Sequence, residues 1–495
     1  MVLEELRKTR IEKKKILEDK GINPYPAKTR RDFLLSEVVK GFDEISKKED
    51  IHLVGRVMSI RGQGGLVFFN INDGTGLFQG LLKKDLPAPG TARQAGEMDE
   101  KIFDLFQNTV DIGDFVEING SLFITKRGEK TVQVKGWRML TKSLRPLPEK
   151  WHGLQDEEEK LRKRYLDIIF NNDVKEMIEK RAKFFYSIRN FLQNKNFMEV
   201  ETPVLENTAG GAEARPFITH YNAYDVDVYL RISPELWLKR LMVAGFNKVY
   251  EIGKVFRNEG ADAEHLQDYM HMEFYSAYSD YNEGMKLVEE MYKFLAQETF
   301  GTLKFKIKGF DIDLGGKWEV YDYVETIEKM TGVNVMKADL KQIESKLKDL
   351  KVDFDKKGFN LNRGIDTLWK YCRKQISGPG FLINVPVIME PLAKRMAENK
   401  ELVERFQIIL AGSEMGKGFS ELNDPIDQLE RFTEQAKLRE EGDEEAQMMD
   451  GEFVEALEYG MPPTFGFGVS ERLFWFLMDK PGRECQIFPF MRPRG

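Results

Sequence analysis

The runs VYEIGKVFRNEG (249–260) and YMHMEFYSAY (269–278) predict two long strands that form a hairpin, and the larger part of the chain is organised around them. Side chains of a strand alternate between the two faces of a sheet. One face of the first strand therefore holds Glu251, Gly253, Val255 and Arg257. On the second strand the polar face holds Tyr269, His271, Glu273 and Tyr275, and the apolar face Met270, Met272 and Phe274. Such a polar row is either a binding surface or the solvated side of an antiparallel sheet, and alternation alone favours the solvated side.

The sequence on either side of this hairpin divides into several parts. Five short β-rich runs broken by glycine-rich turns fill residues 51–141 and predict a small closed β-barrel, with the OB-fold as the leading candidate. Two prolines in LRPLPEK (144–150) indicate a linker. We expect a basic helical extension at 1–50, the barrel domain at 51–143, a linker at 144–170 and an α+β domain at 171–495, with a helical insertion at about 323–376.

Composition limits the protein's class. A chain of 495 residues is long enough for two to four domains. Its 75 basic and 82 acidic residues give a net charge of −7, which at first disfavours a nucleic-acid partner. That average conceals a basic arm at 1–40, with 11 basic and 7 acidic residues, and an acidic block at 421–460, with 3 basic and 14 acidic residues.

Cysteine usage and hydropathy bear on location. Two cysteines are too few for a disulfide framework or a cysteine zinc site, which indicates a reducing compartment. The charged N-terminus does not resemble a signal peptide, and no run of about 18 apolar residues predicts a membrane span. We therefore expect a cytoplasmic protein with no membrane partner.

Three runs resemble the signature motifs of class II aminoacyl-tRNA synthetases, namely FMEVETPVL (197–205), FRNEG (256–260) and GFGVSERL (466–473). Further runs look like class II lysyl-tRNA synthetases in particular: GGAEARPF (210–217), LRISPELWLKRL (230–241), GFSELNDPIDQ (418–428), FVEALEYGMPPT (453–464) and IFPFMRP (487–493). The resemblance covers nearly the whole chain apart from the insertion. It implies an α+β fold with an N-terminal OB-fold β-barrel and a class II catalytic domain, built on an antiparallel β-sheet flanked by helices.

The resemblance also implies an activity and an ATP site. The family activates L-lysine with ATP to lysyl-adenylate and pyrophosphate, then transfers lysine to the 3′ end of tRNA(Lys) for protein synthesis. Arg257 would stabilise the charge that develops at the α-phosphorus, and Arg472 would hold the γ-phosphate. Other positions that match ATP-binding residues are Glu259 and Tyr269 for adenine, His265 for the phosphates and Glu414 for Mg²⁺.

Recognition of lysine requires carboxylates, because a buried ammonium without a partner loses its proton or costs several kcal/mol. By resemblance, the lysine-binding residues are Gly211, Glu235, Glu273, Tyr275, Phe419 and Glu421. A pocket of this kind rejects neutral amino acids strongly, but it discriminates against an analogue one methylene shorter by only about 1–3 kcal/mol. Ornithine-like competitors are therefore the expected weakness.

Several positions depart from the family pattern. Gln407 stands where a second magnesium-binding glutamate is usual, which leaves the number of Mg²⁺ ions open. Lys417 replaces an asparagine that contacts the amino acid, and its charge could pair with the substrate carboxylate or with Glu414. The loop from 266 to 271 differs, Tyr269 replaces a phenylalanine, and Glu471 stands in place of an aspartate in a motif one residue shorter than usual.

Resemblance extends to partners. Phe68, Gln79 and Glu129 match barrel positions that read the anticodon by stacking and hydrogen bonds, and the basic arm would contact tRNA phosphates. The first motif predicts a homodimer. One rival interpretation is an aspartyl- or asparaginyl-tRNA synthetase, which Glu421 disfavours because a carboxylate-bearing substrate needs an arginine. The others are a paralogue that attaches lysine to a protein, and a non-charging nucleic-acid-binding or signalling protein on the same scaffold.

Overall fold

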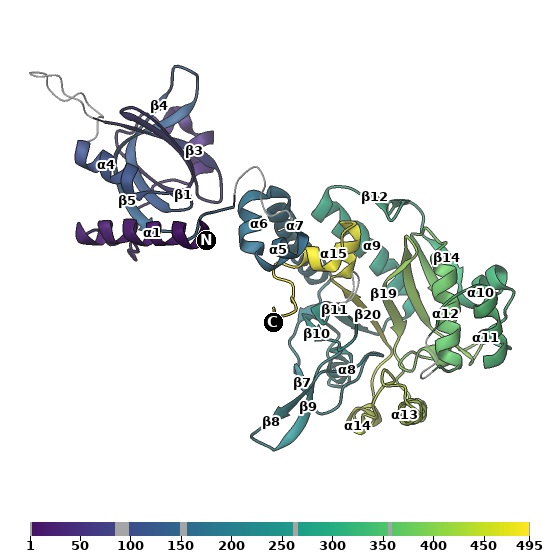
Figure 1. The fold of residues 1–495 in the computed structure, drawn as a ribbon. Coiled ribbons are helices and arrows are strands. Elements are labelled where there is room, and N and C mark those ends of the chain that lie inside the picture. The colour runs from purple at the N-terminus through teal and green to yellow at the C-terminus, as the bar shows by residue number, and fades with distance from the viewer. Residues whose placement is uncertain (1, 85–98, 149–155, 261–265, 355–358, 495) are drawn as a thin grey trace, which may run out of the picture. The chain divides into compact units, whose positions relative to one another are not determined.

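A computed structural model describes residues 2–84, 99–148, 156–260, 266–354 and 359–494, which fall into two compact units, 1–155 and 156–495 (Figure 1). The first unit is a closed barrel with strand order β1-β2-β3-β5-β4, which confirms the predicted OB-fold barrel. Its strands are β1 (Ile51–Gln63), β2 (Leu66–Asn72), β3 (Leu77–Lys83), β4 (Phe115–Ile124) and β5 (Lys130–Thr141). Buried and half-buried residues alternate along β2, as the period of two requires.

Helix α4 (Glu100–Thr109) lies between β3 and β4 in the chain and is absent from the sequence prediction. It buries Phe103 and Phe106 in the core of the barrel, and the side chain of Asp99 caps its first turn by accepting a hydrogen bond from the Lys101 amide. Its spacing of Phe103 and Phe106, three residues apart, is the signal that could have predicted it.

The N-terminal extension forms α1 (Val2–Asp19), α2 (Leu35–Lys40) and α3 (Phe42–Ile45), which pack on the barrel. Leu17 is buried in the barrel core, whereas Leu3 and Leu6 are exposed. Two of the basic residues of α1 serve the fold. Arg10 donates to the Ile112 carbonyl at 2.9 Å, and Lys13 contacts Asp111 at 2.6 Å.

The second unit is built on an eight-stranded sheet with the order β14-β15-β18-β19-β20-β11-β10-β6. Its neighbours are antiparallel except at the two edges, where β14 pairs with β15 and β10 with β6 in parallel. The strands are β6 (Met198–Glu199), β10 (Lys248–Phe256), β11 (Asp268–Ala277), β14 (Glu319–Asp322), β15 (Gly380–Ile383), β18 (Arg405–Leu410), β19 (Ser413–Ser420) and β20 (Thr464–Ser470). This confirms the antiparallel sheet of the predicted catalytic domain.

Helices cover both faces of this sheet, and two separate apolar clusters result (Figure 1). Residues of α7 (Asn172–Asn194), α9 (Tyr281–Phe300) and α15 (Arg472–Leu477) pack on Met272 and Phe274, the apolar face predicted for β11. Residues of α8 (Glu235–Val243), α13 (Pro425–Glu440) and α14 (Gly451–Glu458) belong to the second cluster.

The stretch expected to be a helical insertion, at about 323–376, contains α10 (Tyr323–Thr331), α11 (Leu340–Asp349) and α12 (Leu361–Arg373). The expected linker at 144–170 contains α5 (Glu157–Arg162) and α6 (Arg164–Phe170), because Asp156 caps α5 and three glutamates follow it. The remaining short elements are β7 (Leu205–Glu206), β8 (Ile218–Tyr221), β9 (Val226–Leu230), β12 (Lys304–Ile307), β13 (Phe310–Asp313), β16 (Val385–Pro386), a 3-10 turn at Val387–Met389, β17 (Leu402–Val403) and α16 (Gly482–Cys485). None of the described helices has both the length and the apolar character needed to cross a membrane.

Candidate active site

The predicted hairpin forms β10 and β11, and its register places the two polar rows on one face. Glu251 pairs with Glu273, and Gly253 with His271. This face is buried, so the solvated interpretation of the alternation is wrong. Glu251 accepts hydrogen bonds from Arg231 and, at 2.6 Å, from the Thr202 hydroxyl, both supplied by the segment that precedes α8.

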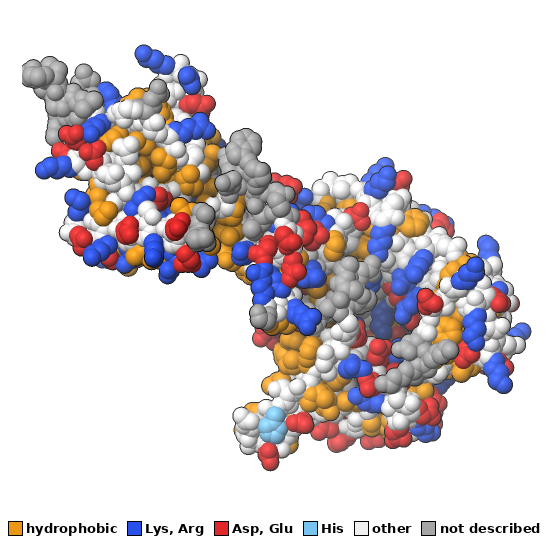
Figure 2. Space-filling view, in the orientation of Figure 1, with side chains coloured by type: hydrophobic (Ala, Val, Ile, Leu, Met, Phe, Trp, Pro, Cys, Tyr) orange, Lys and Arg blue, Asp and Glu red, His pale blue; other side chains and the backbone are white. Residues whose placement is uncertain are grey.

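A cavity of about 530 Å³ opens over this face, and acidic and basic side chains surround the hollow in Figure 2. It brings together most of the predicted site residues, namely Gly211, Glu235, Arg257, Glu259, Glu273, Tyr275, Glu414, Phe419 and Glu421. Arg472 and Tyr269 do not line it, and His265 lies outside the described residues.

Two glycines of β20 create the room for these carboxylates. A Cβ at Gly466 would collide with Glu421 Oε1 and with the ring of Tyr275. At Gly468 it would lie 3.3 Å from Glu273 Cγ. Register makes Gly468 the neighbour of both Lys417 and Glu273, so the cation and the carboxylate flank a bare stretch of backbone.

Glu273 is held as an ionised carboxylate. It accepts hydrogen bonds from the Ser233 hydroxyl at 2.6 Å and the Tyr275 hydroxyl at 2.9 Å, and His271 Nε2 lies 3.2 Å from it. Burial alone would raise the pKa of Glu273, but the bonds and charge of these neighbours lower it below the usual value.

Glu235 and Glu421 already share a cation that the sequence reading missed. Lys239, one turn after Glu235 on α8, lies 2.6 Å from Glu235 Oε1 and contacts Glu421 Oε2. All three side chains are buried, with Lys239 at 0% and Glu421 at 1% exposure. The ring of Phe419 lies 5.3 Å from the Lys239 ammonium. The Glu–Lys spacing of four residues on a helix was the available signal.

Burial is the largest influence on the pKa values of Glu235 and Glu421. It raises the pKa of Glu235 to about 7 and the pKa of Glu421 well above its ordinary value, against the opposing charge of Lys239. The charge of Glu235 also raises the pKa of Glu421, and the charge of Glu273 raises the pKa of both. An additional cation in the cavity would therefore be strongly favoured here.

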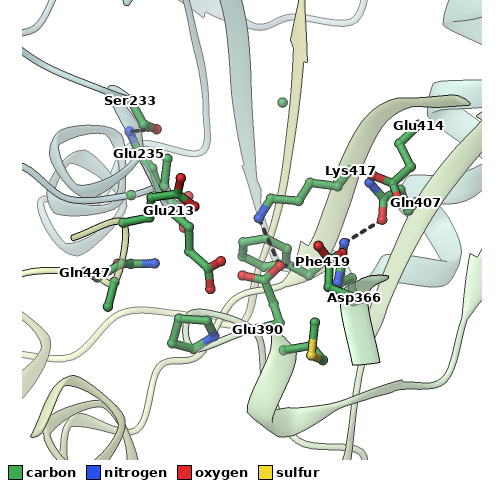
Figure 3. Close-up of a pocket in the computed structure, with 18 of the residues that line it drawn as sticks. Glu213, Ser233, Glu235, Asp366, Glu390, Gln407, Glu414, Lys417, Phe419 and Gln447 are labelled. Atoms are coloured by element: carbon green, nitrogen blue, oxygen red, sulfur yellow. Dashed lines mark hydrogen bonds and ion pairs between the residues drawn. The ribbon is translucent and has the colours of Figure 1, made fainter. Parts of the chain in front are cut away.

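Lys417 crosses the cavity from β19 toward Glu390, as Figure 3 shows. Its Nζ lies 2.9 Å from the buried Glu390 carboxylate, with Arg405 3.5 Å away on the same group. Arg405 also donates to Gln407 Oε1 at 2.6 Å. Lys417 was expected to pair with the substrate carboxylate or with Glu414. In the structure it pairs with Glu390 and not with Glu414.

Glu414 is the candidate metal ligand. Its Oε1 accepts a hydrogen bond from the Trp369 indole at 2.6 Å. Within the described residues, no group of three His, Cys, Asp or Glu side chains could hold a metal by itself. This donor set fits one Mg²⁺ that takes most of its ligands from phosphate and water; it does not fit a second ion at Gln407, whose oxygen Arg405 occupies.

Arg257 and Arg472 lie near Tyr269. The Arg257 guanidinium is 5.6 Å from the Tyr269 ring centre, and its buried Nε has no hydrogen-bond partner among the described residues. Burial raises the pKa of Tyr269, and the charges of both arginines oppose that rise. Arg472 begins α15 and lines a second cavity of about 210 Å³ together with Trp475 and Phe476.

The predicted anticodon residues lie on the outside of the barrel. Phe68 of β2 and Gln79 of β3 occupy half-buried outward positions on adjacent strands. Gln79 Oε1 accepts a hydrogen bond from Thr131 at 2.8 Å, which leaves its amide NH₂ as a donor. Glu129 is exposed in the turn just before β5, two residues from Thr131.

Comparison with known proteins shows what the chain resembles. Residues 156–492 match a family model described as tRNA synthetases class II (D, K and N), and residues 51–140 match one described as OB-fold nucleic acid binding domain. The lysine-tRNA ligase of Thermotoga maritima is 43% identical over 500 residues, covering 100% of this chain and 97% of the ligase. The lysine-tRNA ligase of Roseiflexus sp. (strain RS-1) is 42% identical and is covered completely, as is this chain.

Proposed function

Because this chain belongs to the class II lysyl-tRNA synthetases and is a lysine-tRNA ligase, we propose that the cavity of the second unit binds L-lysine and ATP and forms lysyl-adenylate. The observation that carries this assignment is the convergence of Glu235, Glu273 and Glu421 in one cavity that Gly466 and Gly468 keep open. ATP–pyrophosphate exchange that depends on lysine, and not on aspartate or asparagine, is the experiment that tests it.

The side-chain ammonium of lysine binds between Glu235 and Glu421, beside Phe419. Its backbone lies over Gly468, with the α-ammonium toward Glu273 and the α-carboxylate toward Lys417. Neighbouring strands are about 4.8 Å apart, so the Cα atoms of residues 417 and 273 are about 10 Å apart, which leaves room for the zwitterion between them. Gly211, with φ at +82° and its Cα against Ser233, forms the wall beside it, and Tyr275 holds Glu273.

For the chemical step, one oxygen of the lysine carboxylate attacks the α-phosphorus of ATP, a C–O–P bond forms and pyrophosphate leaves. Arg257 stabilises the negative charge that develops there, a role that its unpartnered Nε supports. Glu259 contacts the adenine amino group, Tyr269 stacks on adenine, and His265 and Arg472 contact the phosphates. When bound at Glu414, Mg²⁺ neutralises the charge of the phosphates.

The barrel binds the anticodon of tRNA(Lys) through Phe68, Gln79 and Glu129, and free basic residues of the arm add contacts to phosphates. A homodimer is supported by large apolar side chains that remain exposed in the first signature motif, including Met198, Val204 and Leu205. The protein would act in the cytoplasm, where ribosomes use the charged tRNA.

Phe68→Ala should leave lysine-dependent exchange unchanged but lower kcat/KM for tRNA(Lys) charging by roughly 10- to 100-fold, because a stacked base contributes about 1–3 kcal/mol. Steady-state charging with tRNA(Lys) transcript measures this. Ile102→Ala provides the matched control, because this exposed apolar residue belongs to α4, which holds none of the proposed anticodon residues. Normal charging by the Phe68 variant would contradict the anticodon assignment.

A further inference from the structure

We propose that Lys239 is a positioning residue for lysine recognition: its ammonium keeps Glu235 and Glu421 together as counter-ions and limits their pocket to one further cation, the side chain of the substrate. The inference rests on the proposed function, in which these two carboxylates bind the substrate ammonium. Lys239 itself would not touch the reacting atoms.

Two carboxylates and two aromatic rings surround the Lys239 ammonium. Lys239 contacts Glu235, one turn before it on α8, and also Glu421, which directly follows β19. It therefore links α8 to the sheet. Rings of Phe419 and Phe453 lie 5.3 and 6.0 Å from its Nζ. Carboxylates and aromatic faces around one ammonium form the environment that a second, chemically identical ammonium also needs.

Charge counting explains why one cation must be built in. Glu235, Glu421 and Glu273 are three buried carboxylates in contact or close proximity, and burying like charges without partners is costly. His271 and the two hydroxyls satisfy Glu273, which leaves Glu235 and Glu421 for Lys239.

The other titratable groups that face the pair come from three elements. From β11 these are Glu273, His271 and the Tyr275 hydroxyl, from β19 Lys417, and from the segment before β17 Glu390, which Lys417 neutralises. With Lys239 in place, the pKa of Glu235 is about 7 and burial raises that of Glu421 well above its ordinary value, so the empty pair binds a proton near neutral pH. Substrate ammonium replaces that proton.

Lysine binding at Glu235 and Glu421 depends on pH. The ammonium pairs only with ionised carboxylates, so lysine binding to the unmodified enzyme releases about one proton and weakens as the pH falls through 7. Loss of the Lys239 charge raises both carboxyl pKa values further. In Lys239→Met, lysine binding should therefore release about one more proton than in the unmodified enzyme, and KM for lysine at pH 7 should rise by about tenfold or more.

Calorimetric titration of the full-length enzyme with lysine, in buffers of different ionisation enthalpy, counts these protons. Lys293→Met is the matched control, since Lys293 makes the same four-residue contact with Glu289 at 2.6 Å on α9, away from the cavity. KM for ATP should stay unchanged in both variants, and KM for lysine in Lys239→Met should fall as the pH rises.

Lys239→Gln offers a second variant, because its amide fills the space and still donates to one carboxylate. A Lys239 variant that folds and releases the same number of protons as the unmodified enzyme overturns the proposal. Release of two protons by the unmodified enzyme overturns it too, and this measurement needs no variant. Failure of the underlying assignment looks different: Glu421→Gln would then bind lysine normally.

Discussion

Glu421→Gln should lower kcat/KM for lysine in ATP–pyrophosphate exchange by roughly 100- to 5000-fold, because breaking a buried charge pair costs about 3–5 kcal/mol. Glu421 is 1% exposed and contacts the Lys239 ammonium, so a second ammonium beside it depends on its full charge. Glutamine keeps the shape, but its NH₂ group presents a donor where the substrate also presents donors.

ATP binding should survive this substitution, since Glu421 pairs with Lys239 and not with the proposed ATP residues. Calorimetric titration with ATP measures that binding directly. Glu434→Gln on the exposed side of α13 is the matched control and should behave as the unmodified enzyme. Unchanged lysine kinetics in Glu421→Gln would contradict the role given to Glu421.

Arg257→Gln should lower kcat for exchange by roughly 100- to 1000-fold, the usual effect of removing one preorganised donor from a developing oxyanion. KM for lysine should change much less, because in the proposed complex the side-chain ammonium of lysine binds at Glu235 and Glu421. Pre-steady-state formation of lysyl-adenylate isolates this step.

The matched control for Arg257 is Arg30→Gln, which removes a surface ion pair with Asp32 at 3.0 Å in the first unit. It should leave exchange unchanged, as isolated surface pairs contribute little. A kcat within a fewfold of normal for Arg257→Gln would place the charge stabilisation on another group.

Alternation and motif spacing predicted much of the second unit because they depend on local geometry. The hairpin at β10 and β11 and its apolar face at Met272 and Phe274 follow from the period of two in a strand. Alternation alone favoured a solvated polar face, whereas the family resemblance placed Glu273 and Tyr275 in the lysine pocket, because burial of Glu251 and Glu273 depends on tertiary packing of the 202–235 segment.

Side-chain partners were the least predictable part of the site. Lys239 belongs to a quoted motif, yet its contact with Glu421 joins residues 182 positions apart, as 421 minus 239 shows. Lys417 likewise pairs with Glu390, 27 residues before it in the chain, a contact that no local pattern indicates. Arg472, expected to hold the γ-phosphate, lines a separate cavity with Trp475 and Phe476, although its charge acts on Tyr269 as that of Arg257 does.

The most direct test of lysine recognition by buried carboxylates is kcat/KM for amino-acid-dependent ATP–pyrophosphate exchange, measured with lysine, norleucine, ornithine and aspartate. Norleucine keeps the four side-chain carbons of lysine but lacks the ammonium, so it leaves Glu235 and Glu421 without their partner and should be rejected by about 10⁴-fold or more. Ornithine, one methylene shorter, should be rejected by only about 10- to 200-fold. Exchange supported by lysine alone at these ratios is the expected result, whereas exchange with norleucine within tenfold of lysine, or exchange driven by aspartate, would contradict the account.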